Sequence, residues 1–198
     1  MRYSPDHKTE SRKRILNAAA QQIRLKGPEQ FGVADVMSAA GLTHGAFYAH
    51  FNSKDALVAE AIAAMFTEVQ RHGGGLAEAL DDEDADIRQA LRVYLGGYLS
   101  PRHRDRPDGG CPLPTLAADL ARTDGLAREN FVSGIDRMTM RIQTALVRLG
   151  RSRAEADARA VVAQMVGAVG LARAVGVGAQ SDAFLRDCLD ALLTKLDL

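Results

Sequence analysis

The 198-residue sequence predicts an all-α protein of about nine helices. Apolar residues recur three and four positions apart along most of the chain, as at Leu16, Ala19 and Ile23, which places them on one face of a helix. The sequence shows no sustained alternation of polar and β-branched residues, which would indicate strands. Hydrophobic residues make up 46% of the chain and charged residues 25%, a balance that supports a sizeable core and excludes general disorder.

Each helix is predicted from its periodicity and its end signals. Gly27 ends the first helix, and Ser53 with Asp55 supplies the cap and the first-turn acid that begin the fourth. The acidic segment 81–86 and the proline-rich segment 101–114 are expected to be solvated loops. The helices after the first are expected at residues 32–40, 43–50, 53–72, 85–99, 112–122, 125–149, a stretch that follows Ser152, and 181–195.

The charges are balanced overall but unevenly distributed. Lys and Arg total 25 and Asp and Glu total 25, which excludes a uniformly basic protein. Residues 1–26 contain two acidic residues, Asp6 and Glu10, and seven basic ones. The basic residues are Arg2, Lys8, Arg12, Lys13, Arg14, Arg24 and Lys26. This local excess predicts an anionic partner for the N-terminal end.

Cysteine usage and hydropathy predict the cellular setting. Cys111 and Cys188 are too few for a disulfide framework. The first residues form no apolar secretion signal, and the apolar stretch 161–179 is interrupted by Gln164 and Arg173. A soluble protein in the reducing cytoplasm is therefore expected.

Residues 31–54 have the pattern of two short helices around a tight turn. Gly41 can adopt the left-handed conformation that such a turn needs. Val36, Ala40, Leu42 and Phe47 are the apolar positions that would hold the two helices together. The pattern predicts a helix-turn-helix, the motif that places its second helix in the DNA major groove. The alternative is that Gly41 simply ends an ordinary helix.

The second helix has residues suited to reading DNA. Its first residues are small or polar, so the backbone can approach base edges, and later residues can reach phosphates. Arg12, Lys13 and Arg14 are expected to flank the duplex. The residues expected to contact DNA are Thr43, which can also cap the helix, His44, Gly45, Ala46, Tyr48, His50 and Lys54.

The run from Gly41 to Leu57 (GLTHGAFYAHFNSKDAL) closely resembles the DNA-binding region of the TetR (tetracycline-repressor-like) family of bacterial regulators, as does the run from Arg14 to Ala19. The resemblance covers about residues 8–62. It implies a DNA-binding domain at 1–52 and an effector-binding and dimerisation domain at 53–198, in which 53–72 connects the two. His44 and Ala46 depart from the residues that many members carry.

The resemblance implies a ligand-responsive regulator, most often a repressor, that a small molecule releases from a palindromic operator. Helices near 85–99, 112–122 and 125–149 could surround the effector, although residues at helical spacing can equally be plain core. The candidate wall residues are Tyr94, Tyr98, Cys111, Leu113, Leu116, Phe131, Ile135, Met138 and Met165.

Cys111 lies near a predicted helix start, where a thiol pKa falls. His103 and nearby arginines could lower it further, so Cys111 is a candidate sensor of oxidants or electrophiles. The alternative is a partly buried small residue beside the pocket.

Small residues at helical spacing near the C-terminus predict a close helix contact. With the last helix they could form a four-helix interface with a second copy of the chain, as the resemblance also implies. Burial of both helices within one chain is the alternative. The candidate interface residues are Ala163, Gly167, Gly170, Ala174, Leu185, Leu189 and Leu192.

The sequence contains no P-loop, dinucleotide fingerprint, H-E-x-x-H or G-x-S-x-G motif. We therefore expect no enzyme, no cofactor and no metal site. The partners predicted are a double-stranded DNA operator, a small-molecule effector and a second copy. The rival class is a helical enzyme or ligand carrier, which would lack salt-sensitive binding to a palindrome.

Overall fold

The computed structural model describes residues 5–72 and 75–198. Within these residues the chain forms ten α-helices and one 3-10 helix, η1, and contains no strand. Arg2, which contributes to the basic N-terminal excess, lies outside the described residues. The all-α prediction is confirmed, with two more elements than the nine expected.

The elements follow in order along the chain. They are α1 (Pro5–Lys26), α2 (Val33–Ala39), η1 (His44–Ala49), α3 (Lys54–His72), α4 (Leu76–Asp81), α5 (Ile87–Tyr98), α6 (Pro101–Arg104), α7 (Leu113–Leu120), α8 (Leu126–Arg148), α9 (Ala154–Ala174) and α10 (Ala179–Leu196).

The two unpredicted helices, α4 and α6, are short and lie in or beside segments expected to be loops. The Ser100 hydroxyl caps α6 by accepting a hydrogen bond from the backbone N–H of His103 at 3.2 Å, and Pro101 occupies the first turn. Arg148 reaches from α8 to the carbonyl oxygens in and after α4, among them Ala79 at 3.1 Å and Asp82 at 3.0 Å. No periodic pattern in the sequence predicts the Ser100 cap or the Arg148 contacts, so these two short helices were not expected.

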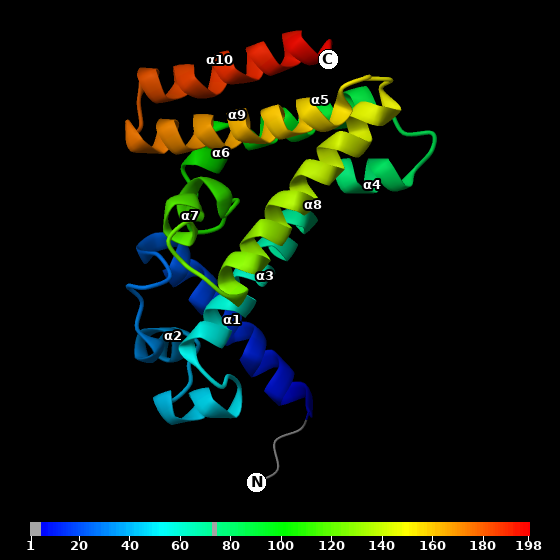
Figure 1. Ribbon diagram of the computed structural model, residues 1–198. Coiled ribbons are helices and arrows are strands. Elements are labelled where there is room, and N and C mark those ends of the chain that lie inside the picture. Colours follow the sequence, from blue (N-terminus) through cyan, green and yellow to red (C-terminus); the bar gives the residue numbers. More distant parts are fainter. Residues whose placement is uncertain (1–4, 73–74) are drawn as a thin grey trace.

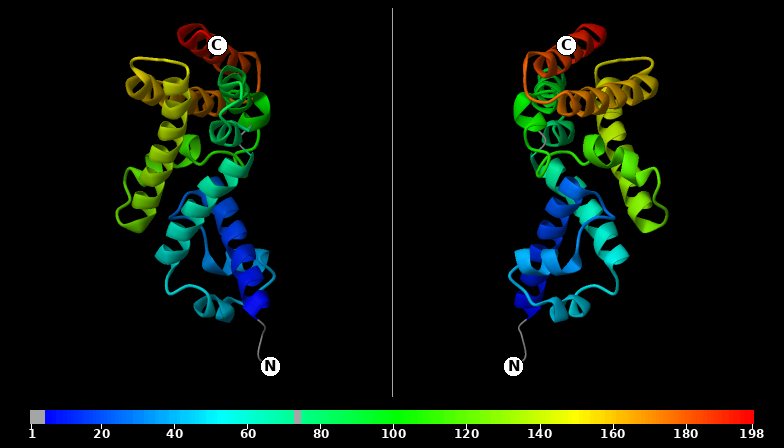
Figure 2. Two further views of the ribbon diagram at one scale, coloured as in Figure 1. Left: turned by 90° about the vertical axis from the view of Figure 1, so that its right-hand side faces the viewer. Right: turned by 90° about the vertical axis from the view of Figure 1, so that its left-hand side faces the viewer.

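The molecule is elongated, and the long helices α3 and α8 lie side by side in its middle (Figure 1). We call residues 5–52, with α1, α2 and η1, the head, and residues 75–198 the body. Helix α3 runs from the head along α8, and α9 and α10 form an antiparallel pair at the far end of the body. The side views in Figure 2 show the same separation of the head from α10.

The contact between α3 and α8 is close because α8 has a glycine where α3 has an aromatic ring. Leu57, Ala61 and Met65 are buried along α3. The Asn130 side chain of α8 donates a hydrogen bond to the Ala59 carbonyl at 2.8 Å. Gly134 lies directly against the Phe66 ring. The connecting helix is thus held firmly to the body.

No helix in the described part of the chain is both long enough and apolar enough to span a membrane.

Candidate nucleic-acid interface

The turn between α2 and η1 has the predicted geometry. Gly41 has a φ of +68°, and the N–H of Leu42 donates to the Met37 carbonyl at 2.9 Å. This is a glycine-terminated helix end of the kind that reverses the chain. Val36, Ala40 and Phe47 are buried and hold the two elements together, as predicted.

The second element is a 3-10 helix rather than the predicted α-helix. It has six residues, and Phe47 is the buried residue that anchors it. The Phe47 ring lies 5.8 Å from Phe51 and 5.2 Å from Tyr48 between ring centroids. Thr43 precedes it in an extended conformation, and its side chain caps no backbone N–H, contrary to the prediction. The 3-10 form is common in helical pieces as short as these six residues.

The predicted DNA-contacting residues lie mostly on an open surface at the end of the molecule. Thr43, His44 and Gly45 are exposed, and Tyr48 is 71% exposed. No atom would lie within 4 Å of a Cβ added to Gly45. The other three predicted contacts are half-buried, namely Ala46, His50 and Lys54.

Arg12 does not point freely into solvent as predicted. Its guanidinium donates to the Glu60 carboxylate of α3 at 2.7 Å and to the His50 carbonyl, and it lies 4.2 Å from the Phe51 ring centroid. An opposite charge and an aromatic face within the chain hold it. Arg12 therefore fixes α1 and α3 to the end of η1, whereas Lys13 and Arg14 are exposed.

Lys54 and His50 also have internal roles. The Lys54 ammonium donates to the Glu29 carbonyl at 2.9 Å and lies 4.6 Å from the Phe31 ring centroid. Burial lowers the pKa of His50, and the charges of Lys8 and Arg12 lower it further. In the free protein these effects favour the neutral imidazole, which can still offer a hydrogen bond to a phosphate.

The predicted effector residues lie in the core of the body. Tyr94 and Tyr98 of α5 lie close to Cys111, which precedes α7, and the Tyr98 hydroxyl is beside the Cys111 thiol. Burial is the main cause that raises the pKa of both tyrosines. Leu113, Leu116, Phe131, Met138 and Met165 are also buried, and Ile135 is half-buried.

Tyr94, Tyr98 and Cys111 are each no more than 7% exposed. The structure has two shallow surface hollows elsewhere. One, of about 450 Å³, lies over the start of α8 around Arg128 and Val132. The other, of about 370 Å³, lies on the head beside Arg14, Asn17 and Gly41. The Tyr98 hydroxyl is buried without a hydrogen-bond partner of acceptable geometry.

Cys111 is not the activated thiol that the sequence suggested. It is 2% exposed, and burial raises its pKa, which outweighs the opposite effects of Tyr98, Arg173 and Arg24. Burial disfavours the thiolate because the charge loses its hydration. Proximity to a helix start, visible in the sequence, is the weaker effect here.

The neutral imidazole of His103 holds the segment before α7 in place. Its Nδ1 lies 2.8 Å from the Tyr98 carbonyl, and its Nε2 accepts the backbone N–H of Cys111 at 3.0 Å. The proton therefore lies on Nδ1. A Cβ on Gly110 would approach the imidazole to 2.8 Å, so the ring fits only against glycine. The sequence had suggested His103 as a cation that would acidify Cys111.

Acid is expected to destabilise the chain partly through His103. Burial lowers its pKa in the folded state, so the unfolded chain binds more protons as the pH falls below about 6.5, and stability is lost. In urea titrations from about pH 7.5 to about pH 5, His103→Gln should lose less stability than the wild type, since the amide can donate and accept without titrating. Equal pH dependence of both proteins would contradict this.

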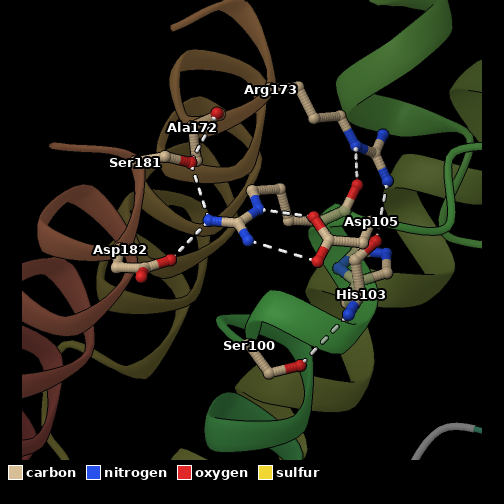
Figure 3. Close-up of polar contacts among 8 residues, drawn as sticks. Ser100, His103, Asp105, Ala172, Arg173, Ser181 and Asp182 are labelled. Carbon is tan, nitrogen blue, oxygen red and sulfur yellow. Dashed lines mark hydrogen bonds and ion pairs between the residues drawn. The ribbon is translucent and has the colours of Figure 1, made fainter. Parts of the chain in front are cut away.

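The segment from Ser100 to Cys111 is also tied to α9 and α10, as Figure 3 shows. The Arg104 guanidinium donates to Ser181 at 2.8 Å and to Asp182 at 2.5 Å, both in α10. From α9, Arg173 donates to the carbonyl oxygens of Arg104 at 3.1 Å and His103 at 3.0 Å. Sequence reasoning missed these anchors; the one signal was Arg173, a charge within an apolar stretch.

The predicted interface residues divide into two groups. On α9, Ala163, Gly167 and Ala174 are exposed and Gly170 is half-buried. On α10, Leu185 and Leu192 are buried within the chain itself. Leu189 is half-buried, 4.0 Å from a Cβ that would be added to Gly96 of α5. The leucines of α10 therefore stabilise the single chain. The predicted interface residues that remain exposed lie on α9.

Comparisons with known proteins agree with this architecture. Residues 15–61 match the model for bacterial regulatory proteins of the tetR family, and residues 88–187 match the tetracyclin repressor-like C-terminal domain. Together these two matches cover most of the chain.

Two curated relatives match over less than half of the chain. The uncharacterised HTH-type transcriptional regulator YdgC of Bacillus subtilis (strain 168) is 36% identical over 86 residues, which are 42% of this chain and 44% of YdgC. The HTH-type transcriptional regulator TtgR of Pseudomonas putida is 32% identical over 84 residues, 42% of this chain and 38% of TtgR. The match thus spans about two fifths of the length of these relatives.

A solved structure extends the likeness to the whole fold. A TetR transcriptional regulator from Chloroflexus aurantiacus J-10-FL superposes with a TM-score of 0.80 and 25% identity, covering 97% of this chain and 96% of the other. With both family models matched in chain order, the chain belongs to the tetR family of bacterial regulatory proteins.

Proposed function

We propose that the protein is a transcriptional regulator, typically a repressor, that binds a palindromic DNA operator and is released by a small molecule. The observation that carries the proposal is the exposed surface of η1, where Gly45 is open and Tyr48 is 71% exposed. Family membership and the HTH-type regulators among its relatives support it. The proposed domains are 1–52 for DNA and 53–198 for effector and dimer. Because the target is the chromosome, we also propose a cytoplasmic location.

Each residue predicted to contact DNA has a proposed role. Thr43 and His44 face base edges, and Gly45 with Ala46 lets the backbone approach. Tyr48 donates its hydroxyl to a phosphate, and neutral His50 adds a hydrogen bond. The Lys54 ammonium uses one of its three N–H donors on the Glu29 carbonyl, which limits how far it can reach toward a phosphate. Its contribution is therefore smaller than its charge alone suggests.

A second copy completes the proposed regulator. The open face of α9 combines the small residues Ala163, Gly167 and Ala174 with Leu171, which is 52% exposed. Small residues allow two helices to approach closely, and an exposed leucine supplies apolar area to bury. We propose that this face, flanked by α10, forms the dimer interface.

We propose that the effector binds beside Tyr94, Tyr98 and Cys111. The Tyr98 hydroxyl is buried beside the Cys111 thiol, a weak partner, and no other group satisfies it with good geometry, so the polar group of a ligand would satisfy it better. The apolar surroundings, with Phe131 and Met138, favour an apolar molecule with one polar group.

Tyr98→Phe is expected to raise the free energy of unfolding by up to about 1 kcal/mol, because it removes a buried hydroxyl whose polar neighbour, the Cys111 thiol, is a weak hydrogen-bond partner outside good geometry. Urea unfolding measures the change. Tyr94→Phe is the matched control and should lower stability, since the Tyr94 hydroxyl interacts with Arg141. A clear loss of stability in Tyr98→Phe would show that the hydroxyl is already satisfied.

The function is tested by selecting duplexes from random sequence and measuring affinity by fluorescence anisotropy. Two protomers should bind one palindrome, with an affinity that falls steeply with salt. Tyr48→Ala should weaken binding about tenfold to all sequences, and Lys54→Ala less, whereas Thr43 or His44 substitutions should alter sequence preference. The exposed body variant Val177→Ala is the control.

Unchanged affinity in both Tyr48→Ala and Lys54→Ala would refute the phosphate contacts. If the wild type binds no duplex more tightly than random DNA, the proposal fails, and the rival class of helical enzyme or ligand carrier is favoured.

A further inference from the structure

Arg24 is a buried cation that joins three parts of the chain. It lies in the last turn of α1 and is 3% exposed. Its Nη2 donates to the Glu68 carboxylate of α3 at 3.1 Å, and its Nη1 donates to the backbone carbonyl of Asp108 at 3.1 Å. Asp108 belongs to the segment between α6 and α7, so one guanidinium contacts head, connecting helix and body.

This contact is distinctive among the interactions of the head. Among the hydrogen bonds described for residues 5–52, the bond from Arg24 to the Asp108 carbonyl reaches past α3 into the body. Close by, Gly27 at the end of α1 approaches the Asp119 carboxylate of α7, to which an added Cβ would come within 3.1 Å. The head therefore meets the body at one small area, besides its attachment through α3.

The segment that contains Asp108 is tied to the far end of the body a few residues earlier, at His103 and Arg104. Arg104 ties the same segment to Ser181 and Asp182 of α10, and Arg173 ties it to α9 (Figure 3). Hydrogen bonds from α9 and α10 to residues 103–104, and from Arg24 of α1 to Asp108, thus hold the two ends of one short stretch of backbone. It connects the proposed dimer helices with the first helix of the head, which packs against the proposed DNA-reading turn.

Arg24 is a costly residue if its only role is to fill space. Its Nε has no hydrogen-bond partner, and its carboxylate partner Glu68 has a side chain 49% exposed. A buried charge with incomplete pairing stabilises little compared with an apolar side chain of the same volume. The planar, directional donors of a guanidinium do, however, define the relative placement of the groups they bind.

We propose that Arg24 is a positioning residue that sets the angle of the head relative to the body, and thereby the spacing between the two heads of a dimer. The inference rests on the proposed function as a dimer on a palindrome. Two reading elements reach both half-sites only at one separation, about one helical turn of DNA or its multiple. Without the Arg24 contact, the head pivots on α3, and several separations become accessible.

The test measures spacing tolerance rather than affinity alone. The palindrome selected by the wild type is remade with one or two base pairs inserted or removed between its half-sites, and full-length protein is titrated by anisotropy. The wild type should bind the original spacing at least about tenfold more tightly than the altered ones. Arg24→Met should bind the original less tightly but lose much less affinity on altered spacings, with unchanged affinity for a single half-site.

Two further variants keep the outcome decisive. Arg24→Lys preserves the charge and can bind one partner but not both, so it should also broaden spacing tolerance, and it serves if Arg24→Met does not fold. Asp108→Ala retains the backbone carbonyl and should reproduce the wild-type profile. Folded Arg24→Met or Arg24→Lys could instead lose as much affinity on altered spacings as the wild type does. That result overturns the inference and leaves the proposed function standing. Failure of the wild type to bind any palindrome overturns both.

Discussion

Gly134→Ala is expected to lower the free energy of unfolding by about 3 kcal/mol, a loss typical of overpacking in a closed core. The new methyl group would lie well inside the van der Waals radius of the Phe66 ring, which packs against Phe131 with 5.9 Å between ring centroids. Alanine favours a helix over glycine by about 1 kcal/mol, which offsets only part of the loss. Urea unfolding monitored by circular dichroism measures the result.

The matched control is Gly97→Ala in α5, where an added Cβ meets no atom within 4 Å. That change should leave stability unchanged or raise it by up to about 1 kcal/mol. Phe66→Leu combined with Gly134→Ala should recover part of the loss, because it removes the ring that the methyl group contacts. Equal stability of Gly134→Ala and the wild type would show that α3 and α8 can separate freely, contrary to a firmly held connecting helix.

Gly45→Glu is expected to abolish specific DNA binding, with a loss of at least about 100-fold in affinity, while leaving stability nearly unchanged. The added side chain meets nothing in the protein, so folding is unaffected. On the proposed interface it would place a carboxylate and its aliphatic stem between the backbone and the bases. Anisotropy with the selected palindrome and urea unfolding measure the two quantities separately.

Gly97→Glu makes the same change in charge on an open glycine of the body and controls for net charge. It should bind the palindrome like the wild type. If Gly45→Glu also binds normally, η1 does not enter the groove, and the residues proposed to read DNA are misassigned.

Local sequence patterns predicted the head better than the body. Gly41 and the apolar positions Val36, Ala40 and Phe47 depend on neighbours close in the chain, so their roles follow from spacing. The same holds for the long helices, whose apolar periodicity extends over many residues. The 3-10 geometry of η1 could not be read from spacing, because the apolar spacing of so short a segment fits a 3-10 helix as well as an α-helix.

Roles that depend on burial were the ones the sequence could not predict. Arg12 and Arg24 both count as basic residues near the N-terminus, yet one stacks on Phe51 and the other is buried against Glu68 and Asp108. Cys111 lies just before α7, but desolvation decides its pKa. Leu185 and Leu192 have the periodicity of any apolar helix face, and only the fold shows which partner covers them.

The central claim is that η1 of each protomer lies in a major groove of the operator. Dimethyl sulfate methylates guanine N7, which faces the major groove, and adenine N3, which faces the minor groove, so a protection experiment on the selected palindrome separates the two. The account predicts protection of guanine N7 in both half-sites, centred about one helical turn apart, and its disappearance with Gly45→Glu. Protection confined to adenine N3, or protection that persists in Gly45→Glu, would contradict it.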